Sequence, residues 1–239
     1  MRNPTESFHQ EESDDEAKTL IATIYGQIRN DILVGTLPPN EKLRIEQLRN
    51  RYKVGAGTVR EALGFLVSEA LVVNYGQRGF RVASMTIENF QDITQVRIKL
   101  ETDAIRSSVK NGGDKWETNL VSAFHWLTQA DKMLGIGPGD TFEVWERCNR
   151  DFHMALISEC RSLWTRHFLD ILWTQSERYR RTLRYAEQDN AHLADEHLAI
   201  YEAALARKAG LTAKLVAEHI RNGSNFLAEL ADKKPTGNK

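Results

Sequence analysis

The sequence predicts a mostly α-helical protein built in two parts, and three observations support this. Apolar residues recur at helical spacing along most of the chain, whereas strand-like runs are confined to residues 71–82. A glycine-rich turn, residues 55–57, leads into a helix that starts near Thr58. No proline interrupts residues 40–137 or 139–234, so long helices can form there. These features predict an N-terminal winged helix-turn-helix with a small β-hairpin wing, followed by an all-α antiparallel helical bundle.

The N-terminal part is divided by its acidic segment, its apolar stripe and its helix breakers. Residues 1–18 carry six acidic and two basic residues, which predicts a disordered acidic tail. An apolar stripe over residues 20–33 predicts the first helix, which ends in the glycine- and proline-containing turn of residues 35–40. A short helix over residues 45–52 comes next, just before the glycine-rich turn. We therefore expect a DNA-binding domain over residues 19–84.

Composition and charge narrow the class of protein. The net charge is −1, but residues 19–84 contain nine Lys or Arg and five Asp or Glu residues. Such a local positive excess suits contact with DNA phosphates, although an ordinary mixed surface would show the same balance. Cys148 and Cys160 are too few for a disulfide framework, and no apolar run suits a signal peptide or a membrane span. A cytoplasmic protein is therefore expected.

Six residues of the N-terminal domain are predicted to contact DNA: Arg44, Gly57, Thr58, Arg60, Gln77 and Arg78. Arg60 stands in the first turn of the recognition helix, where an arginine can bind guanine with two hydrogen bonds or hold a phosphate. Thr58 can donate to a phosphate, and Arg78 at the wing tip can enter a minor groove. The alternative is that Arg60 only pairs with Glu61 or Asp31 on the surface. The turn and the wing beside Arg60 favour DNA contact.

The C-terminal part, residues 85–232, is expected to bind an effector and to form a dimer contact. Its helices are predicted near residues 87–109, 116–134, 141–159, 162–186, 191–207 and 211–231. The glycines of residues 111–114 and 135–140, and Gly210, separate these helices. Residues 233–239 are expected to form a loose tail.

Four residues of this part form a candidate metal site: Asn149, His153, His197 and His219. Asn149 and His153 are four residues apart and share one helix face, and each histidine lies on an otherwise apolar stripe. One such histidine is usually a hydrogen-bonded core residue, but three on three helices favour a divalent metal over a purely polar cavity. Imidazole ligands indicate Zn²⁺ first, with Ni²⁺ and Mn²⁺ as alternatives.

Arg97 is the main candidate for binding an effector. It lies on the apolar side of the first C-terminal helix, and an inward arginine needs an anion. That anion is either Glu101, four residues later, or the carboxylate of a ligand. Gln175, Arg178 and Asn222 are weaker candidates for the lining of the same cavity.

Motifs along the chain point to a known family. Three of them are Ile32-Leu33-x-Gly35-x-Leu37-x-Pro39, Val59-Arg60-Glu61-Ala62-Leu63 and Arg78-Gly79-Phe80-Arg81-Val82. With them, residues 24–83 resemble the GntR family of bacterial transcription regulators. Further motifs are Arg97-x-x-Leu100-Glu101, Asn149-x-x-Phe152-His153, Glu196-His197 and Ala217-Glu218-His219. These resemble the FCD domain, the all-helical effector domain of the FadR subfamily. The wing and Lys42-Leu43-Arg44 look most like the carbon-starvation-induced regulator group.

The resemblance implies a role for several residues, and the sequence also departs from the family pattern. In the family, the position of Arg97 contacts small organic acids. The family's turn usually carries an arginine that reads guanine, but residues 55–58 here are Gly-Ala-Gly-Thr. The first metal position is commonly aspartate, whereas Asn149 can coordinate only through its neutral carbonyl oxygen. The usual operator and the usual metal affinity are therefore not expected.

The function expected from these features is a ligand-responsive transcription regulator, most simply a repressor, and not an enzyme. As a homodimer it would bind an inverted-repeat DNA operator, and a dicarboxylate, sugar acid or aromatic acid would change its affinity. A metal-dependent enzyme built on the histidines is the alternative, but it leaves the N-terminal domain unexplained. It also lacks a general base, because Glu146 and Asp151 lie off the histidine face. A winged helix used for protein contact is a third reading, which specific DNA binding would exclude.

Overall fold

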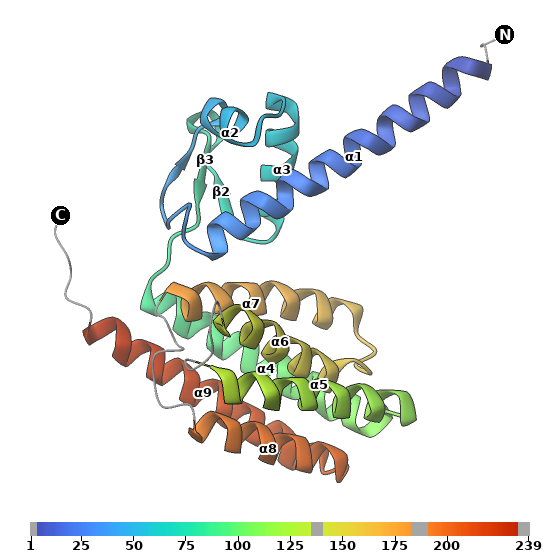
Figure 1. Cartoon of the computed structure of the whole chain (residues 1–239). Coiled ribbons are helices and arrows are strands. Elements are labelled where there is room, and N and C mark those ends of the chain that lie inside the picture. Colours follow the sequence, from blue (N-terminus) through green and yellow to red (C-terminus); the bar gives the residue numbers. More distant parts are fainter. Residues whose placement is uncertain (1–3, 135–140, 183–190, 234–239) are drawn as a thin grey trace. The chain divides into compact units, whose positions relative to one another are not determined.

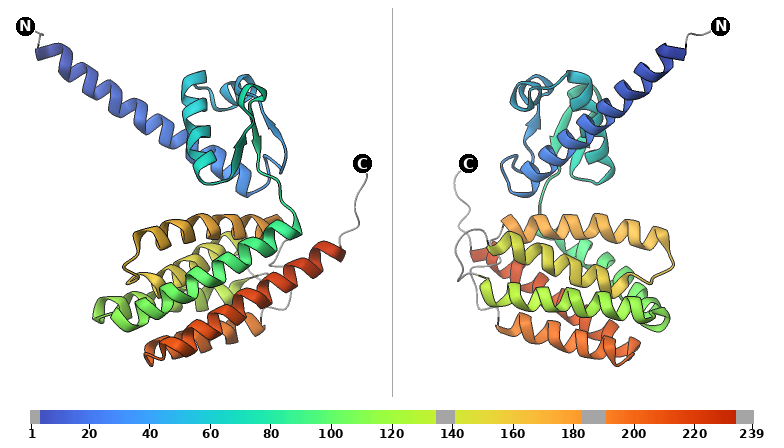
Figure 2. Two further views of the ribbon diagram at one scale, coloured as in Figure 1. Left: turned by 180° about the vertical axis from the view of Figure 1, so that it is seen from behind. Right: turned by 45° about the vertical axis from the view of Figure 1, so that its right-hand side comes forward.

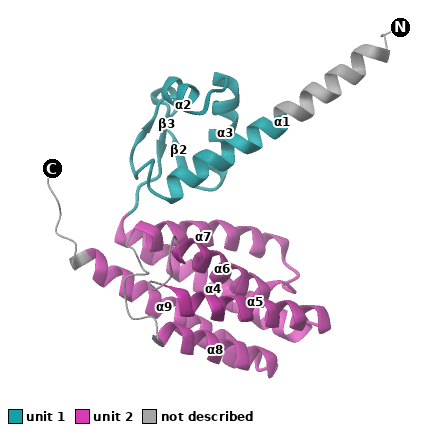
Figure 3. Cartoon of the chain, viewed as in Figure 1, with its two compact units in different colours: residues 1–85 teal, residues 86–239 magenta. Residues whose placement is uncertain are grey.

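The computed structural model describes residues 4–134, 141–182 and 191–233, and the chain divides into two compact units (Figure 3). Unit 1 comprises Met1–Met85 and unit 2 comprises Thr86–Lys239. The predicted fold class is confirmed, because a small three-stranded antiparallel sheet in unit 1 accompanies an otherwise helical chain (Figure 1). Among the described helices, none is both long and apolar enough to cross a membrane.

Unit 1 is a winged helix-turn-helix. Its elements are α1 (Pro4–Leu33), β1 (Lys42–Leu43), α2 (Ile45–Tyr52), α3 (Ala56–Ser68), β2 (Val72–Asn74) and β3 (Phe80–Val82). The apolar faces of the three helices meet over one core, in which Ile28, Leu48 and Leu63 are buried. A 3₁₀ turn, Gly76–Arg78, joins β2 to β3 and forms the tip of the wing.

Two parts of unit 1 differ from the sequence-based prediction. The structure extends α1 upstream to Pro4, where a disordered tail through residue 18 was expected. Proline is well accepted at the first residue of a helix, and no further proline follows until Pro38. Strand β1 was not predicted as a strand, because two residues are too short for a visible alternation. It forms because β3 lies between β1 and β2 in the sheet, so that Leu43 pairs with Phe80 and Val72 pairs with Val82.

Ala70 lies in a left-handed conformation just after α3, with a φ of 56°. Its N–H donates to the carbonyl of Val67, which fixes the turn before Leu71 enters the core. A Cβ atom is unfavourable in this conformation, so we expect Ala70→Gly to raise the free energy of unfolding by about 1 kcal/mol. Urea denaturation measures the change. The matched control is Ala22→Gly on the exposed side of helical α1, which should instead destabilise by about 1 kcal/mol; equal destabilisation by both changes would contradict the account.

Unit 2 is an all-helical bundle. Its helices are α4 (Ile87–Asn111), α5 (Asp114–Met133), α6 (Thr141–Ile157), α7 (Leu163–Thr182), α8 (Ala191–Leu205) and α9 (Ala209–Lys233). Helix α4 packs against α9 and α7, while α5 packs against α6 and α8 (Figure 2). Buried aromatic side chains, including Trp116, Phe152 and Trp173, fill the space between them. This packing brings α4, α6, α8 and α9 around one polar site.

The ends of these helices follow signals that the sequence contains. Thr86 caps α4, since its hydroxyl accepts a hydrogen bond from the Asn89 N–H at 3.1 Å. Each described helix of unit 2 begins and ends within a few residues of its predicted bounds. The glycine-rich residues 135–140, the predicted last turn of α7 beyond Thr182, and most of the predicted loose tail of residues 233–239 lie outside the described residues.

Candidate functional site

The first turn of α3 presents the predicted DNA-contacting side chains to solvent. Val59 and Leu63 are fully buried and anchor one face of the helix. Gly57 and Arg60 are therefore exposed on the other face, and Thr58 is half-buried. Arg60 makes no hydrogen bond or ion pair with any described residue, which leaves its guanidinium available for DNA.

The surface pairing considered as an alternative for Arg60 is absent from the described residues. Asp31 instead accepts a hydrogen bond from Tyr52 at 2.7 Å and pairs with Arg51 at 2.8 Å. Burial and the neighbouring Asp31 raise the pKa of Tyr52, which keeps its hydroxyl a hydrogen-bond donor. Asp31 thus ties α1 to α2.

The wing exposes the two side chains that were predicted at its tip. Gln77 and Arg78 lie in the 3₁₀ turn, between Gly76 and Gly79 with φ values of 62° and 81°. Both glycine conformations are left-handed, so side chains with a Cβ would be strained there. Arg44, the residue before α2, is also exposed. All six predicted DNA-contacting residues therefore lie at the surface of unit 1 or, for Thr58, partly so.

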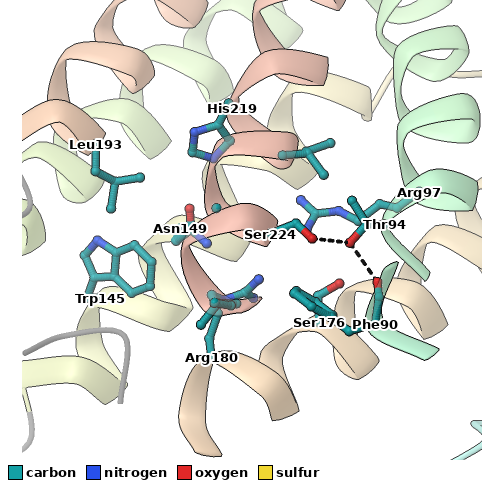
Figure 4. Close-up of a pocket in the computed structure, with 13 residues that line it drawn as sticks. Phe90, Thr94, Arg97, Trp145, Asn149, Ser176, Arg180, Leu193, His219 and Ser224 are labelled. Carbon is teal, nitrogen blue, oxygen red and sulfur yellow. Dashed lines mark hydrogen bonds between the residues drawn. The ribbon is translucent and has the colours of Figure 1, made fainter. Parts of the chain in front are cut away.

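The three predicted metal-binding histidines converge in unit 2. His153 of α6, His197 of α8 and His219 of α9 offer ring nitrogens that all lie within 4.8 Å of one another. The ring centroids of His197 and His219 are 4.8 Å apart, and those of His153 and His219 are 5.2 Å apart. Asn149 is buried one helical turn before His153 and lines the same pocket as His219 (Figure 4). The structure thus brings the three histidines together, and their binding of a metal stays a prediction.

Several polar atoms at this point are buried with no hydrogen-bond partner within the described part of the chain. They are Asn149 Oδ1, His153 Nε2, and both ring nitrogens of His197. A buried polar atom without a partner costs free energy, so such atoms are rarely left in a native structure. A divalent cation accepts electron pairs from imidazole nitrogen and amide oxygen, so these residues fit a metal.

Carboxylates behind two of the histidines determine which nitrogen faces the site. Glu101 Oε1 lies 3.1 Å from His153 Nδ1, and Glu196 Oε2 lies 2.7 Å from His219 Nδ1. With Nδ1–H donating to a carboxylate, each Nε2 is left with its lone pair toward the site. The sequence did not predict the hydrogen bond between Glu196 and His219. Glu196 is adjacent to His197 in the sequence, whereas His219 belongs to another helix.

The protonation states also suit metal binding. Burial lowers the pKa of His153 to about 3, and burial likewise lowers the pKa of His219, so both rings are neutral near pH 7. Burial alone would raise the pKa of the Glu101 carboxyl, but the Arg97 charge and the hydrogen bond from His153 outweigh it and lower the pKa to about 2. Neutral imidazoles backed by ionised carboxylates are the form that binds a divalent metal.

A small pocket lies beside the histidines and reaches Arg97. Polar side chains of Thr94, Ser176 and Ser224 contribute to its walls, and the hydroxyls of Thr94 and Ser224 are hydrogen-bonded at 3.2 Å across α4 and α9 (Figure 4). Its volume of about 40 Å³ is enough for water rather than for an organic acid. A ligand would therefore have to move side chains as it enters.

Arg97 lines this pocket as predicted, and it also has the structural partner that was considered. Its Nε atom pairs with Glu101 at 2.9 Å, and its guanidinium carbon lies 3.7 Å from the ring centroid of Trp173. Its two terminal nitrogens have no hydrogen-bond acceptor among the described residues. Arg97 can thus hold Glu101 and still present two N–H groups to an anion.

The weaker effector candidates lie outside the pocket lining. Arg178 donates to Gln175 at 3.0 Å, and Asn222 donates to Glu196 at 2.6 Å, which supports the carboxylate behind His219. Arg180, which was not predicted, lines the pocket instead and forms two hydrogen bonds with buried Glu146. The sequence did not predict which arginine of α7 faces the pocket. Residues 173–180 of this helix are all buried, so no single face stands out as the inward one.

Comparison with known proteins agrees with this geometry. The family model for bacterial regulatory proteins of the gntR family matches residues 20–82, and the FCD domain model matches residues 92–222. The chain is 43% identical to the HTH-type transcriptional regulator BphR of Paraburkholderia xenovorans, covering 89% of this chain and 86% of that protein. It is 32% identical to the HTH-type transcriptional repressor GlaR of Escherichia coli, covering 82% of this chain and 90% of that protein.

Solved structures show the same fold. The chain resembles Escherichia coli McbR/YncC with a TM-score of 0.71 at 20% identity, covering 89% of this chain and 98% of that structure. A GntR regulator structure from Rhodococcus gives a TM-score of 0.70 at 19% identity, covering 87% of this chain and 97% of that structure. The chain therefore belongs to the gntR family of bacterial regulatory proteins, carries an FCD domain, and is a transcription regulator rather than an enzyme.

Proposed function

We propose that this regulator is a repressor that binds an inverted-repeat operator as a homodimer and responds to a small organic acid bound beside a metal. One observation carries the proposal: unpartnered nitrogens of His153 and His197 converge with His219 beside the pocket that Arg97 lines. In the same chain, unit 1 exposes Arg60 on an anchored helix. The similarity to GlaR, which is named a repressor, supports the sign of regulation.

The metal site is assigned from its donors. His153 and His219 would bind through Nε2, and His197 and Asn149 would supply a nitrogen and an oxygen. This donor set suits Zn²⁺ first, with Ni²⁺ and Mn²⁺ as alternatives. When bound, the metal would supply positive charge and open coordination positions for a carboxylate. Because Asn149 brings no charge, less of that positive charge is compensated than with an aspartate, which favours an anionic effector.

The chain's own residues would bind the other end of the effector and couple it to the fold. The free N–H groups of Arg97 can donate to a carboxylate, and the Ser224 hydroxyl can donate to a further oxygen. The hydroxyls of Thr94 and Ser176 already donate to the carbonyls of Phe90 and Leu172, so their oxygens can accept from hydroxyl groups of the ligand. A dicarboxylate, a sugar acid and an aromatic acid all satisfy these groups. Since the pocket is small, binding requires α4 and α9 to adjust, and the effector shifts the regulator by its preference for the adjusted form.

An exposed aromatic cluster on α7 supports the homodimer. Leu163, Trp164 and Phe168 are 72%, 71% and 48% exposed, and the rings of Trp164 and Phe168 stack with centroids 5.9 Å apart. Large exposed apolar side chains that lie together are typical of an interface. A two-fold dimer uses the same surface on both copies, which an apolar cluster permits without any charge clash.

We therefore expect Trp164→Asp to shift the protein from dimer toward monomer, because a charge would be buried between two apolar surfaces. Light scattering after size-exclusion chromatography, over a range of protein concentrations, measures the change. The matched control is Trp126→Asp, which alters a tryptophan that is 61% exposed on α5. If Trp164→Asp remains a dimer and Trp126→Asp dissociates, the dimer interface lies on α5 and not on α7.

Selection of bound DNA from a random pool tests the proposed function as a whole. The full-length protein is expected to enrich a short inverted repeat, one half-site for each recognition helix. The selection is repeated with representatives of the three acid classes and with Zn²⁺. Enrichment of no palindrome under any condition would contradict operator binding by a dimer.

A further inference from the structure

Asp131 lies between a wall of the pocket and a metal-binding histidine. It belongs to α5, and its Oδ1 atom accepts a hydrogen bond from Trp145 Nε1 of α6 at 2.8 Å. Its other oxygen, Oδ2, lies 3.7 Å from His197 Nδ1 of α8. Trp145 is 1% exposed and lines the pocket beside Asn149 and His219. One carboxylate therefore stands next to both the pocket wall and the histidine.

His197 differs from the other two histidines in having no hydrogen-bonded carboxylate. His153 and His219 have carboxylate oxygens at 3.1 Å and 2.7 Å from Nδ1, whereas 3.7 Å is too long for a hydrogen bond. The His197 ring is fully buried, and neither of its nitrogens has a partner in the described part of the chain. Within the described residues, the carboxylate oxygen that lies within 4 Å of this ring is Oδ2 of Asp131.

Metal binding would create a need for this carboxylate. A metal on Nε2 of His197 leaves the proton on Nδ1, and a buried N–H requires an acceptor. A shift of less than 1 Å would bring Oδ2 of Asp131 within hydrogen-bond distance, since such N–H···O contacts span roughly 2.7–3.2 Å. Oδ1 can keep the Trp145 hydrogen bond during this shift, because a carboxylate accepts through both oxygens.

We propose that Asp131 is the positioning residue for His197, and that it joins this metal ligand to Trp145 in the pocket wall. Each histidine then has one carboxylate that accepts from its Nδ1–H. Glu101 accepts from His153, Glu196 accepts from His219, and Asp131 accepts from His197. The inference rests on the proposed metal site. It adds a consequence for regulation: movement of Trp145 when a ligand enters the pocket changes the hydrogen bond that orients His197, so ligand and metal affinity are coupled.

The first test is the Zn²⁺ affinity of Asp131→Asn, measured by competition with a chromophoric chelator. Trp145 and His197 lie at different oxygens of Asp131, and an amide replaces one of these oxygens with an NH₂ donor, so one of the two N–H groups loses its acceptor. Zn²⁺ affinity is expected to fall roughly 10–100-fold, as for other residues that orient metal ligands. The matched control, Asp103→Asn on α4, removes a carboxylate that is 81% exposed, and is expected to keep wild-type affinity.

The second test measures the response to Zn²⁺ in the wild-type chain. The indole N–H signals of the ¹⁵N-labelled protein are followed during Zn²⁺ titration, and Trp145→Phe identifies the signal of Trp145. That signal is expected to shift as the metal binds, while those of the exposed Trp126 and Trp164 stay. If Asp131 had a purely structural role, Asp131→Asn would lower the stability but keep the wild-type Zn²⁺ affinity. The Trp145 signal of the wild type would then not move during the titration.

The outcomes separate this inference from the proposed function. A wild-type protein that binds no Zn²⁺, Ni²⁺ or Mn²⁺ would overturn the metal site itself. A different set of results would overturn the role of Asp131 alone. In that case the wild type binds Zn²⁺, His197→Ala does not, Asp131→Asn keeps full affinity, and the Trp145 signal does not move.

Discussion

Arg60→Ala is expected to weaken operator binding by about 1–3 kcal/mol, because an arginine at this position can hold one base pair with two hydrogen bonds. The side chain is exposed and has no partner among the described residues, so its removal should leave the fold intact. Fluorescence anisotropy with the selected operator, at several salt concentrations, measures the loss. If Arg60 holds a phosphate instead of a base, the slope of log K against log salt concentration should fall by about 0.9.

A matched control separates this effect from a simple loss of charge. Arg106→Ala on α4 also removes one exposed arginine, which pairs with Asp103 in unit 2. We expect it to leave both the affinity and the salt slope close to those of the wild type. Equal affinity of Arg60→Ala and wild type at every salt concentration would remove Arg60 from the DNA-binding surface.

His197→Ala is expected to weaken Zn²⁺ binding by more than about 100-fold, because it removes a ligand rather than a residue that orients one. The other ligands cannot compensate, since the three ring nitrogens enclose the site from three different helices. Stability supplies a second readout: Zn²⁺ should raise the melting temperature of the wild type and should not raise that of the variant. Metal analysis of the purified proteins and thermal unfolding with and without Zn²⁺ measure both effects.

The control for this change is His167→Ala. His167 is exposed on α7, away from the metal-binding nitrogens, so Zn²⁺ should stabilise this variant as it stabilises the wild type. If Zn²⁺, Ni²⁺ and Mn²⁺ all fail to stabilise the wild type, the metal proposal is contradicted. The buried histidines would then only line a polar cavity.

Features that repeat along a helix were predictable from the sequence. The apolar stripes placed His153, His197 and His219 on inward faces, and the glycines and prolines gave the ends of most helices. The glycine-bounded turn predicted the wing, and the structure forms its tip as a 3₁₀ turn. Periodicity determines which way a side chain points, so these predictions needed no knowledge of neighbouring elements.

Features that depend on neighbours from another helix were not predictable. Arg180 faces the pocket because Glu146 of α6 holds it from the side, although the two residues are 34 positions apart. Gln175 and Arg178 belong to the same helix and lie outside the pocket lining. Strand β1 likewise exists only because β3 offers a free edge. A single sequence shows helix faces, but it does not show which faces meet.

The central claim is that the metal-bearing pocket controls operator binding, and operator affinity measured with and without an effector acid tests it most directly. With Zn²⁺ present, an acid that binds the wild-type protein should lower its operator affinity by about 5–150-fold, the usual range of coupling between two sites. In His197→Ala the same acid should leave operator affinity unchanged. A response to the acid that is equally large in both proteins, or absent from the wild type with every acid class, would contradict the account.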